Sequence, residues 1–351
     1  MTTAPGLGVF AALVVAAAPL AAQAPKVVEQ TSGTKALLKA VSAVNEKVVW
    51  TSGGTAVVRT TDGGDSWEVK TVPDAPTRRL DFRDVYAASA NEAWVLSIGN
   101  GPASRIYHTT DGGSTWKVQF ANADSAAFYD CFTFFDAKHA VVFGDETRGR
   151  TMILRTEDGG EHWNPLPDAV VPAPLKGEGG FASSGGCITS HGKKHAWVGA
   201  GGPEARVFHS EDQGRSWKVV PTPTPFVKAS DAGLTALSFR DDKHGIGVAA
   251  RINARMASDT AAAAVGTSDD GGLTWTLRHR PDKPGAIFGV TWVPKAGKAT
   301  AVASTLGGLF YTTDGAERWT PATTFQYWSV GAAGKRAWGV GPGGRITRID
   351  F

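Results

Sequence analysis

Short runs of alternating apolar and polar residues, separated by glycines and polar turns, follow one another along most of the chain. One group of such runs covers residues 82–87, 93–97 and 105–109, and a fourth run follows at 117–120. Alternation with a period of two is typical of β-strands with one buried face, and runs of about five residues joined by tight turns form an antiparallel meander. The pattern therefore predicts an all-β fold built from four-stranded meanders.

One eight-residue phrase recurs between the third and fourth run of each meander. It reads Thr-Thr-Asp-Gly-Gly-Asp-Ser-Trp in its first copy. Six copies occur at intervals of 44 to 58 residues, at 60–67, 109–116, 156–163, 210–217, 268–275 and 312–319. This period fits one four-stranded blade of a β-propeller, whereas leucine-rich and ankyrin units are shorter, and the WD-repeat signature is absent.

The residue types of the phrase suit a tight turn rather than chemistry. Its second glycine supplies a positive φ, and the sixth copy has Ala316 there, so we expect slight strain. The Asp carboxylate and the leading hydroxyl can accept the turn's own N–H groups, and the Trp covers apolar area of a neighbouring sheet. We assign structural roles to Asp62, Asp111, Asp158, Asp212, Asp270 and Asp314, and to Trp67, Trp116, Trp163, Trp217, Trp275 and Trp319.

The end of the chain holds an incomplete unit. Residues 328–330, 337–340 and 345–348 give three runs without the phrase, and 26–30 gives a spare run before the first inner strand at 37–41. Pairing the spare run with the last one would close the ring and remove an open sheet edge, which is an aggregation hazard. We therefore predict a seven-bladed β-propeller of four-stranded antiparallel blades, closed by an N-terminal strand.

The N-terminus has the composition of an export signal. Residues 7–24 are apolar and rich in alanine, with small residues at Ala22 and Ala24, after either of which a cut fits. A membrane anchor is the alternative, but it needs about 20 apolar residues. We expect residues 1–24 to be a signal peptide and residues 25–351 a single domain. We expect this domain to be a periplasmic or extracellular monomer without a membrane span.

Composition narrows the class of partner. The formal net charge is only +3, and no run of Lys or Arg is dense enough to follow a phosphate backbone, which argues against nucleic acid. The chain has no dinucleotide-binding glycine pattern, haem-attachment motif or thiol pair at redox spacing. We accordingly expect no cofactor.

The two cysteines occupy equivalent places in neighbouring units. Cys131 lies eight residues before His139, and Cys187 lies eight residues before His195. Inner strands converge toward a propeller's axis, so the two Cα atoms could come within the roughly 7 Å that a disulfide allows. Export favours a disulfide, and two buried free thiols are the alternative.

Repetition separates residues of the scaffold from candidate site residues. Five histidines recur at two shared positions: His139, His195 and His244 before a second strand, and His108 and His209 before the repeated phrase. Recurrence at one place in several units indicates a scaffold role. His191 and His195 form an H-x-x-x-H pair, but no third ligand lies nearby in the sequence. We therefore expect no metal site.

Polar residues that do not recur are the better candidates for function. They concentrate in blades 2 to 5, in loops such as the insertion at 250–264, and loops of this kind line one mouth of a propeller. Any single one is more often a solvated loop charge. As a set they form our binding-site hypothesis: Arg78, Arg79, Arg83, Asp84, Asp130, Asp145, Glu178 and Arg251. No residue is assigned a catalytic role.

The repeated phrases match the Asp-box, or BNR repeat. With the runs at 80–85, 127–130, 177–182 and 184–188, the chain resembles exported bacterial propellers related to the photosystem II stability/assembly factor family. The resemblance covers essentially the whole mature chain. It implies a seven-bladed propeller that acts as a binding or assembly platform for a protein, an envelope component or a glycan.

The resemblance also suggests where such a platform would act. A basic patch is the kind of surface that contacts a client in photosynthetic members, and Arg78, Arg79 and Arg83 could take that part here. Blade 5 departs from the group, because Val248-Ala-Ala-Arg251 stands where members tend to have Gly-Gly-Asp-Tyr. Any site that depends on that Asp or Tyr would be lost.

Two enzymatic interpretations stay open. Sialidases and some endoglucanases also carry Asp-boxes, so a sialidase-like glycoside hydrolase is the main alternative. The Arg-Ile-Pro signature of sialidases is absent, and Tyr129 beside Asp130 and Tyr86 beside Asp84 are the closest approximations to their catalytic residues. Members of the group are often labelled oxidoreductase, a second alternative that no motif supports.

Overall fold

The computed structural model describes residues 1–2, 24–222, 229–253, 256, 263–283 and 285–351. Almost all of the predicted signal peptide lies outside the described residues, as does most of the insertion at 250–264, including Arg255. Within the described ranges, no helix is both long and apolar enough to cross a membrane.

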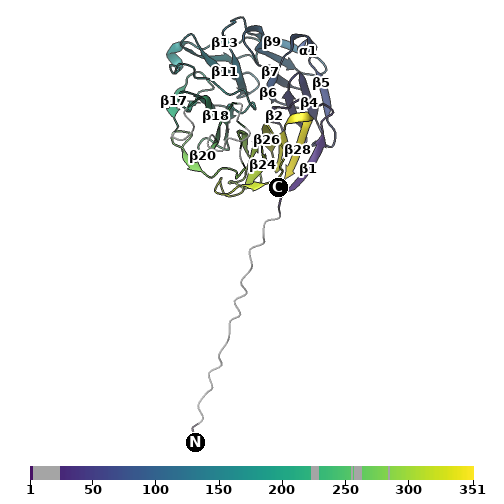
Figure 1. Ribbon diagram of the computed structural model, residues 1–351, viewed down its shortest axis with the longest axis vertical. Helices are drawn as coiled ribbons and strands as arrows, with labels where there is room; N and C mark the ends of the chain where they lie inside the picture. The colour runs from purple at the N-terminus through teal and green to yellow at the C-terminus, as the bar shows by residue number, and fades with distance from the viewer. Residues whose placement is uncertain (3–23, 223–228, 254–255, 257–262, 284) are drawn as a thin grey trace.

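The described chain is almost entirely β-structure, and its strands follow one another around a ring (Figure 1). Unit 1 is β2 (Ala40–Ala43), β3 (Val49–Gly53), β4 (Ala56–Thr60) and β5 (Glu68–Thr71); unit 2 is β6 (Phe82–Ala87), β7 (Ala93–Ser97), β8 (Arg105–Thr109) and β9 (Lys117–Ala121). Unit 3 is β10 (Tyr129–Phe134), β11 (Ala140–Thr147), β12 (Arg150–Thr156) and β13 (Asn164–Pro165).

The later units follow the same plan. Unit 4 is β14 (Ile188–His191), β15 (His195–Gly202), β16 (Arg206–Ser210) and β17 (Lys218–Pro221); unit 5 is β18 (Ala229–Phe239), β19 (Gly245–Arg251), β20 (Ala264–Ser268) and β21 (Thr276–Arg278). Unit 6 is β22 (Ile287–Trp292), β23 (Ala301–Thr305), β24 (Gly308–Thr312) and β25 (Thr320–Pro321). Short helical turns are α1 (Ala75–Arg78), η1 (Gly101–Ala103), η2 (Asp168–Val170) and η3 (Pro342–Gly344).

The two ends of the chain close the ring together. The closing unit is β26 (Ser329–Ala333), β27 (Arg336–Val340), β28 (Arg345–Asp350) and, on its outer side, β1 (Lys26–Thr31). β1 pairs antiparallel with β28 from Lys26↔Asp350 to Thr31↔Arg345, and the two strands lie side by side in Figure 1. This pairing confirms the predicted closure.

Two features of the sheets were not predicted. The first inner strand begins at Ala40 rather than residue 37, because the Leu38 N–H donates to Gly341 O of the closing unit and the Lys39 N–H donates to Ser52 O. Units 4 and 5 form one eight-stranded sheet, in which the end of β15 pairs with the start of β18.

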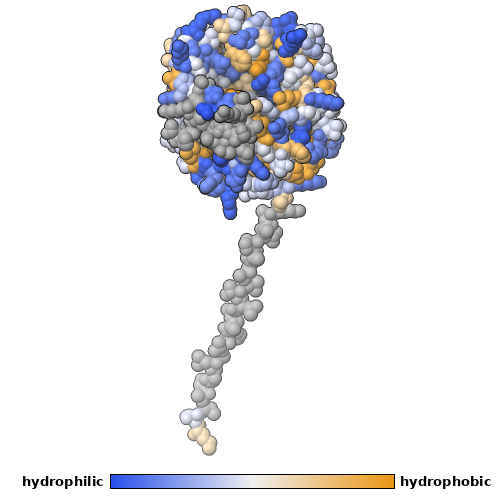
Figure 2. All heavy atoms as spheres, in the orientation of Figure 1, coloured by the Kyte–Doolittle hydropathy of each residue, from blue (hydrophilic) through white to orange (hydrophobic). Residues whose placement is uncertain are grey.

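The core lies between consecutive units rather than within one. Trp50 of unit 1 packs with Phe82 and Tyr107 of unit 2, and similar clusters join each later unit to the next. The last cluster returns to the start, since Trp338 and Ile346 of the closing unit pack with Val49 of unit 1. Hydrophilic and hydrophobic side chains are interspersed over the face drawn in Figure 2.

Each repeated phrase forms a turn that is held by its own aspartate. In the fifth copy, Asp270 Oδ1 accepts the Thr274 N–H at 2.9 Å, and the Ser268 hydroxyl donates to the same oxygen at 2.9 Å. In all six copies the Asp accepts these two bonds, and the leading hydroxyl also accepts the N–H four residues after it. Ala316 has the expected positive φ, 72°, and Gln213 of the fourth copy, which was not predicted, has a φ of 64°.

These turns define the two ends of the ring. A backbone N–H of each turn donates to the hairpin that joins the first two strands of its unit, as Gly63 does to Lys47 O. We call this end the turn mouth. The links between units and the loops between second and third strands lie at the opposite end, which we call the loop mouth.

Candidate functional site

The loop mouth is organised by the segment that precedes β14. We call residues 175–187 the glycine-rich loop. Part of it is tied to the end of β15, where Gly179 and Gly201 exchange two backbone hydrogen bonds of 3.2 and 3.0 Å. Five of the eight residues of the binding hypothesis contact this loop or belong to it: Arg83, Asp84, Asp130, Asp145 and Glu178.

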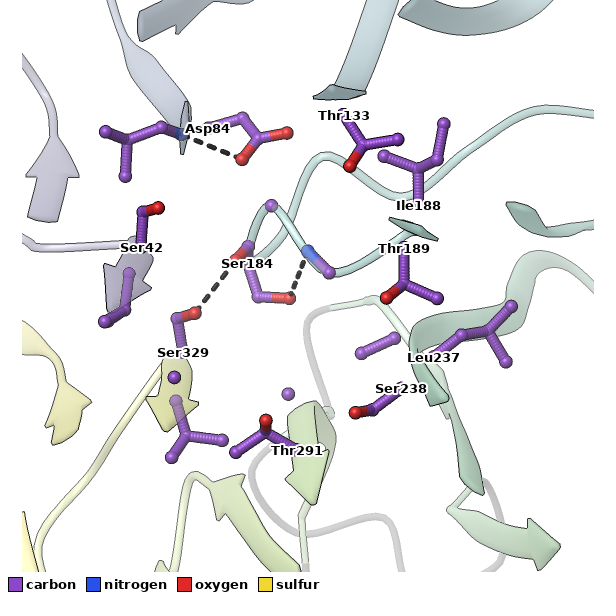
Figure 3. A pocket seen from close by; sticks show the side chains of 18 of the residues that line it. Ser42, Asp84, Thr133, Ser184, Ile188, Thr189, Leu237, Ser238, Thr291 and Ser329 are labelled. Carbon is purple, nitrogen blue, oxygen red and sulfur yellow. Dashed lines mark hydrogen bonds between the residues drawn. The ribbon is translucent and has the colours of Figure 1, made fainter. Parts of the chain in front are cut away.

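The far end of the glycine-rich loop crosses the axis of the ring. The Ser184 hydroxyl donates to Phe288 O at 2.6 Å, and the Ser329 hydroxyl donates to Ser184 O at 2.9 Å. The Leu237 N–H donates to Gly186 O at 2.9 Å, so the loop of unit 4 is bonded to units 5, 6 and the closing unit. Figure 3 shows Ser184 between Ser329 and Asp84. The glycine-rich loop therefore covers the axis of the ring at the loop mouth, and we call the part that does so, residues 184–186, the plug.

Behind this plug is an axial cavity of about 360 Å³, lined by the innermost strands β2, β6, β10, β14, β18, β22 and β26 (Figure 3). Its hydroxyl groups join neighbouring units. Ser42 Oγ accepts the Ala87 N–H at 2.9 Å, and Ser238 Oγ accepts the Trp292 N–H at 3.2 Å. These hydroxyls are therefore already engaged in the scaffold.

The Asp84 side chain lies against the glycine-rich loop at Gly185. Its carboxyl group is 4% exposed and accepts the Val85 and Phe132 N–H groups, both at 2.8 Å, which links β6 to β10. A Cβ atom at Gly185 would lie 2.5 Å from Asp84 Oδ1, so only glycine allows the loop to approach this closely. Burial raises the pKa of Asp84 well above its usual range.

Asp130 and Asp145 form a carboxyl pair under the same loop. Asp130 is 2% exposed and lies against Gly180, where a Cβ atom would come within 3.0 Å of its Oδ2 atom, and Asp145 lies against the neighbouring Gly179. Burial and then the neighbouring Asp145 raise the pKa of Asp130 well above its usual range. Burial raises the pKa of Asp145 to about 6. Both carboxyl groups therefore favour their protonated forms more than exposed aspartates do.

Glu178 anchors the start of the loop through a buried ion pair. Its two carboxylate oxygens accept hydrogen bonds from Nε and Nη2 of Arg206. Arg206 was not among the residues predicted from the sequence. Glu178 is 3% exposed and Arg206 9%, and Glu178 also accepts the Leu175 N–H at 3.1 Å. The sequence signal that could have indicated Arg206 is a charged residue directly before the apolar pair Val207 and Phe208 of a strand.

The arginines of the hypothesis fall into three settings. Arg83 donates to Ala182 O at 3.0 Å and to Asp81 at 2.8 Å, so it also holds the loop. Arg78 and Arg79 end α1 on the surface, where Arg78 pairs with Asp74 at 2.7 Å. Arg251 in β19 pairs with Asp231 in β18 at 3.0 Å, within unit 5.

A pocket of about 280 Å³ opens beside the loop. Asp145, Glu146, Gly202 and residues 177–181 are part of its lining. Glu146 accepts the Gly149 N–H at 2.6 Å and the Gly177 N–H at 3.1 Å, which lower the pKa of its carboxyl group. Glu178, the third acidic residue of the lining, is paired with Arg206, so Asp145 and Glu146 are the carboxyl groups that suit a cationic or N–H-bearing group of a ligand.

A disulfide ties the loop to the neighbouring unit. Cys131 lies in β10, and Cys187 ends the glycine-rich loop, with their Cα atoms 6.2 Å apart. The bond confirms the predicted pairing. It fixes the loop at the end that leads into β14, beside the Asp130 carboxyl.

The fold places the chain in the class of β-propellers. No protein-family model matches the chain, and no curated protein matches it by sequence. Among solved structures it is similar to YCF48 bound to a D1 peptide, with a TM-score of 0.64 and 16% identity over 95% of this chain and 98% of that one. It is also similar to YCF48 from Cyanidioschyzon merolae, with a TM-score of 0.61 and 15% identity over 92% and 98% of the two chains.

Enzymes share the same fold. A GH74 xyloglucanase from Xanthomonas campestris has a TM-score of 0.63 and 15% identity, with 92% of this chain matching 53% of the enzyme. A virginiamycin B lyase from Staphylococcus aureus has a TM-score of 0.60 and 14% identity over 93% of this chain and 99% of the lyase. At these identities the comparison establishes the fold alone.

Proposed function

We propose that the protein is an exported, non-catalytic binding platform that holds a segment of a protein partner at its loop mouth. The observation that carries this proposal is the convergence of Arg83, Asp84, Asp130, Asp145 and Glu178 on the glycine-rich loop. Hydrogen bonds to Phe288 and Ser329 and the ion pair with Arg206 hold that loop in place, and a surface that is held in place loses little conformational entropy when it binds.

We further propose seven Asp-box blades and export through the N-terminal segment. The closing pair of β1 with β28 and the cluster that joins the last unit to the first support a closed ring of seven units. The disulfide supports an oxidising compartment, because such bonds rarely persist in the cytosol. The six turns held by their aspartates support the Asp-box assignment.

The state of the acidic residues favours binding over hydrolysis. A glycoside hydrolase needs two carboxyl groups that face the substrate across a cleft. Asp84, Asp130 and Glu178 are at most 4% exposed and bond to the plug or its neighbours, and Tyr129 is 3% exposed. Of the hypothesised carboxyl groups, Asp145 and Glu178 line the pocket beside the loop, and the Glu178 carboxylate is held by Arg206.

A protein segment is the ligand that the loop mouth suits best. A YCF48 structure of the same fold is described as bound to a D1 peptide, which supports a peptide as the kind of ligand. In our proposal a cationic or N–H-bearing group enters the pocket beside Asp145 and Glu146, and acidic groups of the segment reach Arg78 and Arg79.

Charge reversal on α1 tests this proposal. The Arg78→Glu/Arg79→Glu variant and wild type are used to capture partners from an envelope extract, with Arg215→Glu at the turn mouth as the control. We expect one discrete protein to be lost from the α1 variant and kept by the control, which also reports intact folding. Equal capture by all three proteins, or turnover of aryl glycosides that Asp145→Asn abolishes, would overturn the proposal.

A further inference from the structure

A second cluster of polar side chains lies at the turn mouth, on unit 4. His195 begins β15, His209 lies in β16, and Glu211 follows β16 in the repeated turn. One ligand atom of each lies within 4.8 Å of the other two. Imidazole nitrogens and a carboxylate oxygen are the ligands that zinc takes in proteins.

The spacing of the two imidazoles matches a tetrahedral metal. His195 Nδ1 and His209 Nε2 are 3.3 Å apart. Two nitrogens that are each about 2.0–2.1 Å from a tetrahedral zinc lie about 3.3–3.4 Å from one another. The nitrogens therefore already have the separation that a shared metal requires.

Strand register explains why these side chains meet. Trp197 pairs with His209 across β15 and β16, so His195, two residues earlier, is placed opposite Glu211 on the same face of the sheet. The Trp197 ring stacks on His209 at 4.8 Å, and its Nε1 donates to Gly271 O at 2.7 Å. The tryptophan thus fixes the plane of one imidazole.

The other units show that this arrangement is special to unit 4. His139 and His244 occupy the position of His195, but their Nδ1 atoms are bonded to Asp136 and Asp241, three residues earlier in each hairpin. In unit 4 that place is taken by Gly192, so the His195 Nδ1 atom faces His209 instead.

The position of His209 gives a second contrast. In unit 3 it holds Arg155, which pairs with Glu157, the residue at the position of Glu211. In unit 5 it holds Thr267. Two histidines and an acidic residue therefore occur together at these positions in unit 4 and in no other unit that has a repeated turn.

We propose that His195, His209 and Glu211 bind a divalent transition metal of the kind that prefers imidazole, with Zn²⁺ as its representative. Each imidazole gives one nitrogen and keeps its proton on the other. In the structure Glu211 forms an ion pair with Lys218 at 3.2 Å, and its side chain is 54% exposed. To bind the metal, the Glu211 carboxylate leaves Lys218 and turns toward the two imidazoles. Three protein ligands leave the fourth position open to water.

Metal titration tests the proposal. Tag-free protein is stripped with a chelator and titrated with Zn²⁺ in a calorimeter, and Co²⁺ is used as a spectroscopic probe. We expect one Zn²⁺ per chain and the absorption bands of tetrahedral cobalt. We expect His195→Gln to weaken Zn²⁺ binding by at least about 100-fold and Glu211→Gln to weaken it by about 10-fold.

His244→Gln is the matched control, because it removes the histidine at the same position of unit 5. We expect it to bind Zn²⁺ as wild type does. Circular dichroism checks that each variant is folded. Because the Glu211 side chain is exposed, Glu211→Gln should not disturb the packing of the core. The proposal is overturned if wild type binds no stoichiometric Zn²⁺, or if His244→Gln loses as much affinity as His195→Gln.

Discussion

At the scale of single residues, the carboxyl groups under the glycine-rich loop make its attachment depend on pH. The folded-state pKa of Asp145 is about 6 because the group is buried, whereas the pKa of an unfolded Asp is about 3.9. The folded state thus binds more protons than the unfolded state between these values. The contribution of Asp145 to stability is therefore present below about pH 4 and is lost as pH rises through about 6.

The Asp145→Asn variant tests this pH dependence. The amide keeps a similar shape but cannot ionise, so the part of the decline in unfolding free energy from pH 5 to pH 8 that Asp145 contributes, about 1.4 kcal/mol, should be lost, while the buried Asp84 and Asp130 keep their own contributions. The measurement is the denaturant midpoint as a function of pH. Asp168→Asn, an exposed carboxyl paired with Arg150, should keep the wild-type slope. A slope unchanged in Asp145→Asn would contradict the raised pKa of Asp145.

The sequence located these residues but not their role. Asp84, Asp130 and Glu178 were singled out because they do not recur, and nothing in the pattern showed that the glycine-rich loop would fold over them. Contacts between residues about fifty positions apart, such as Asp84 with Phe132, depend on the closed ring and cannot be read from local spacing. Arg206, the buried partner of Glu178, was missed for the same reason.

At the scale of elements, the local alternation of apolar and polar residues predicts the bounds of some strands but not the hydrogen bonds between units. The strands β6, β7 and β8 match their predicted bounds, since alternation and turn residues determine them. α1 was not predicted, and β2 begins later than expected because the Leu38 N–H bonds across to the closing unit. The joining of β15 to β18 depends on the close approach of Gly201 and Gly233, which alternation does not reveal.

The repeated turns give a test at this scale. Asp270→Ala removes the acceptor of the Thr274 N–H and hydroxyl, and we expect a loss of about 1 kcal/mol, as for other short side-chain caps. Asp269→Ala changes the adjacent exposed carboxyl and should cost well under that amount. Chemical denaturation of both variants measures the difference. Equal losses would show that the aspartate does not hold the turn.

At the scale of the whole molecule, stability depends on bonds between units. Cys131 and Cys187 are 56 residues apart in sequence, and cross-linking a loop of that length stabilises a chain by about 4 kcal/mol in the chain-entropy treatment. The Cys131→Ala/Cys187→Ala variant should lose about this much and become insensitive to reductant. Alkylation of denatured wild type should add mass only after reduction. Alkylation without reductant would exclude the disulfide.

The two mouths of the closed ring carry different structural features. The turn mouth carries the repeated turns, and the loop mouth carries the glycine-rich plug, the pocket beside Asp145 and the surface arginines of α1. The predicted ring arose from counting repeats and a spare strand, which is information spread over the whole chain. The identity of the partner is not encoded in that repetition.

Site-specific photo-cross-linking in living cells tests the choice of mouth most directly. A photoreactive amino acid replaces Arg79 or Lys176 at the loop mouth, and Asp65 or Arg215 at the turn mouth, one position per strain. The account predicts a cross-linked product of one discrete mass from the loop-mouth positions and none from the turn-mouth positions. The same product from the turn mouth, with none from Arg79 and Lys176, would contradict it.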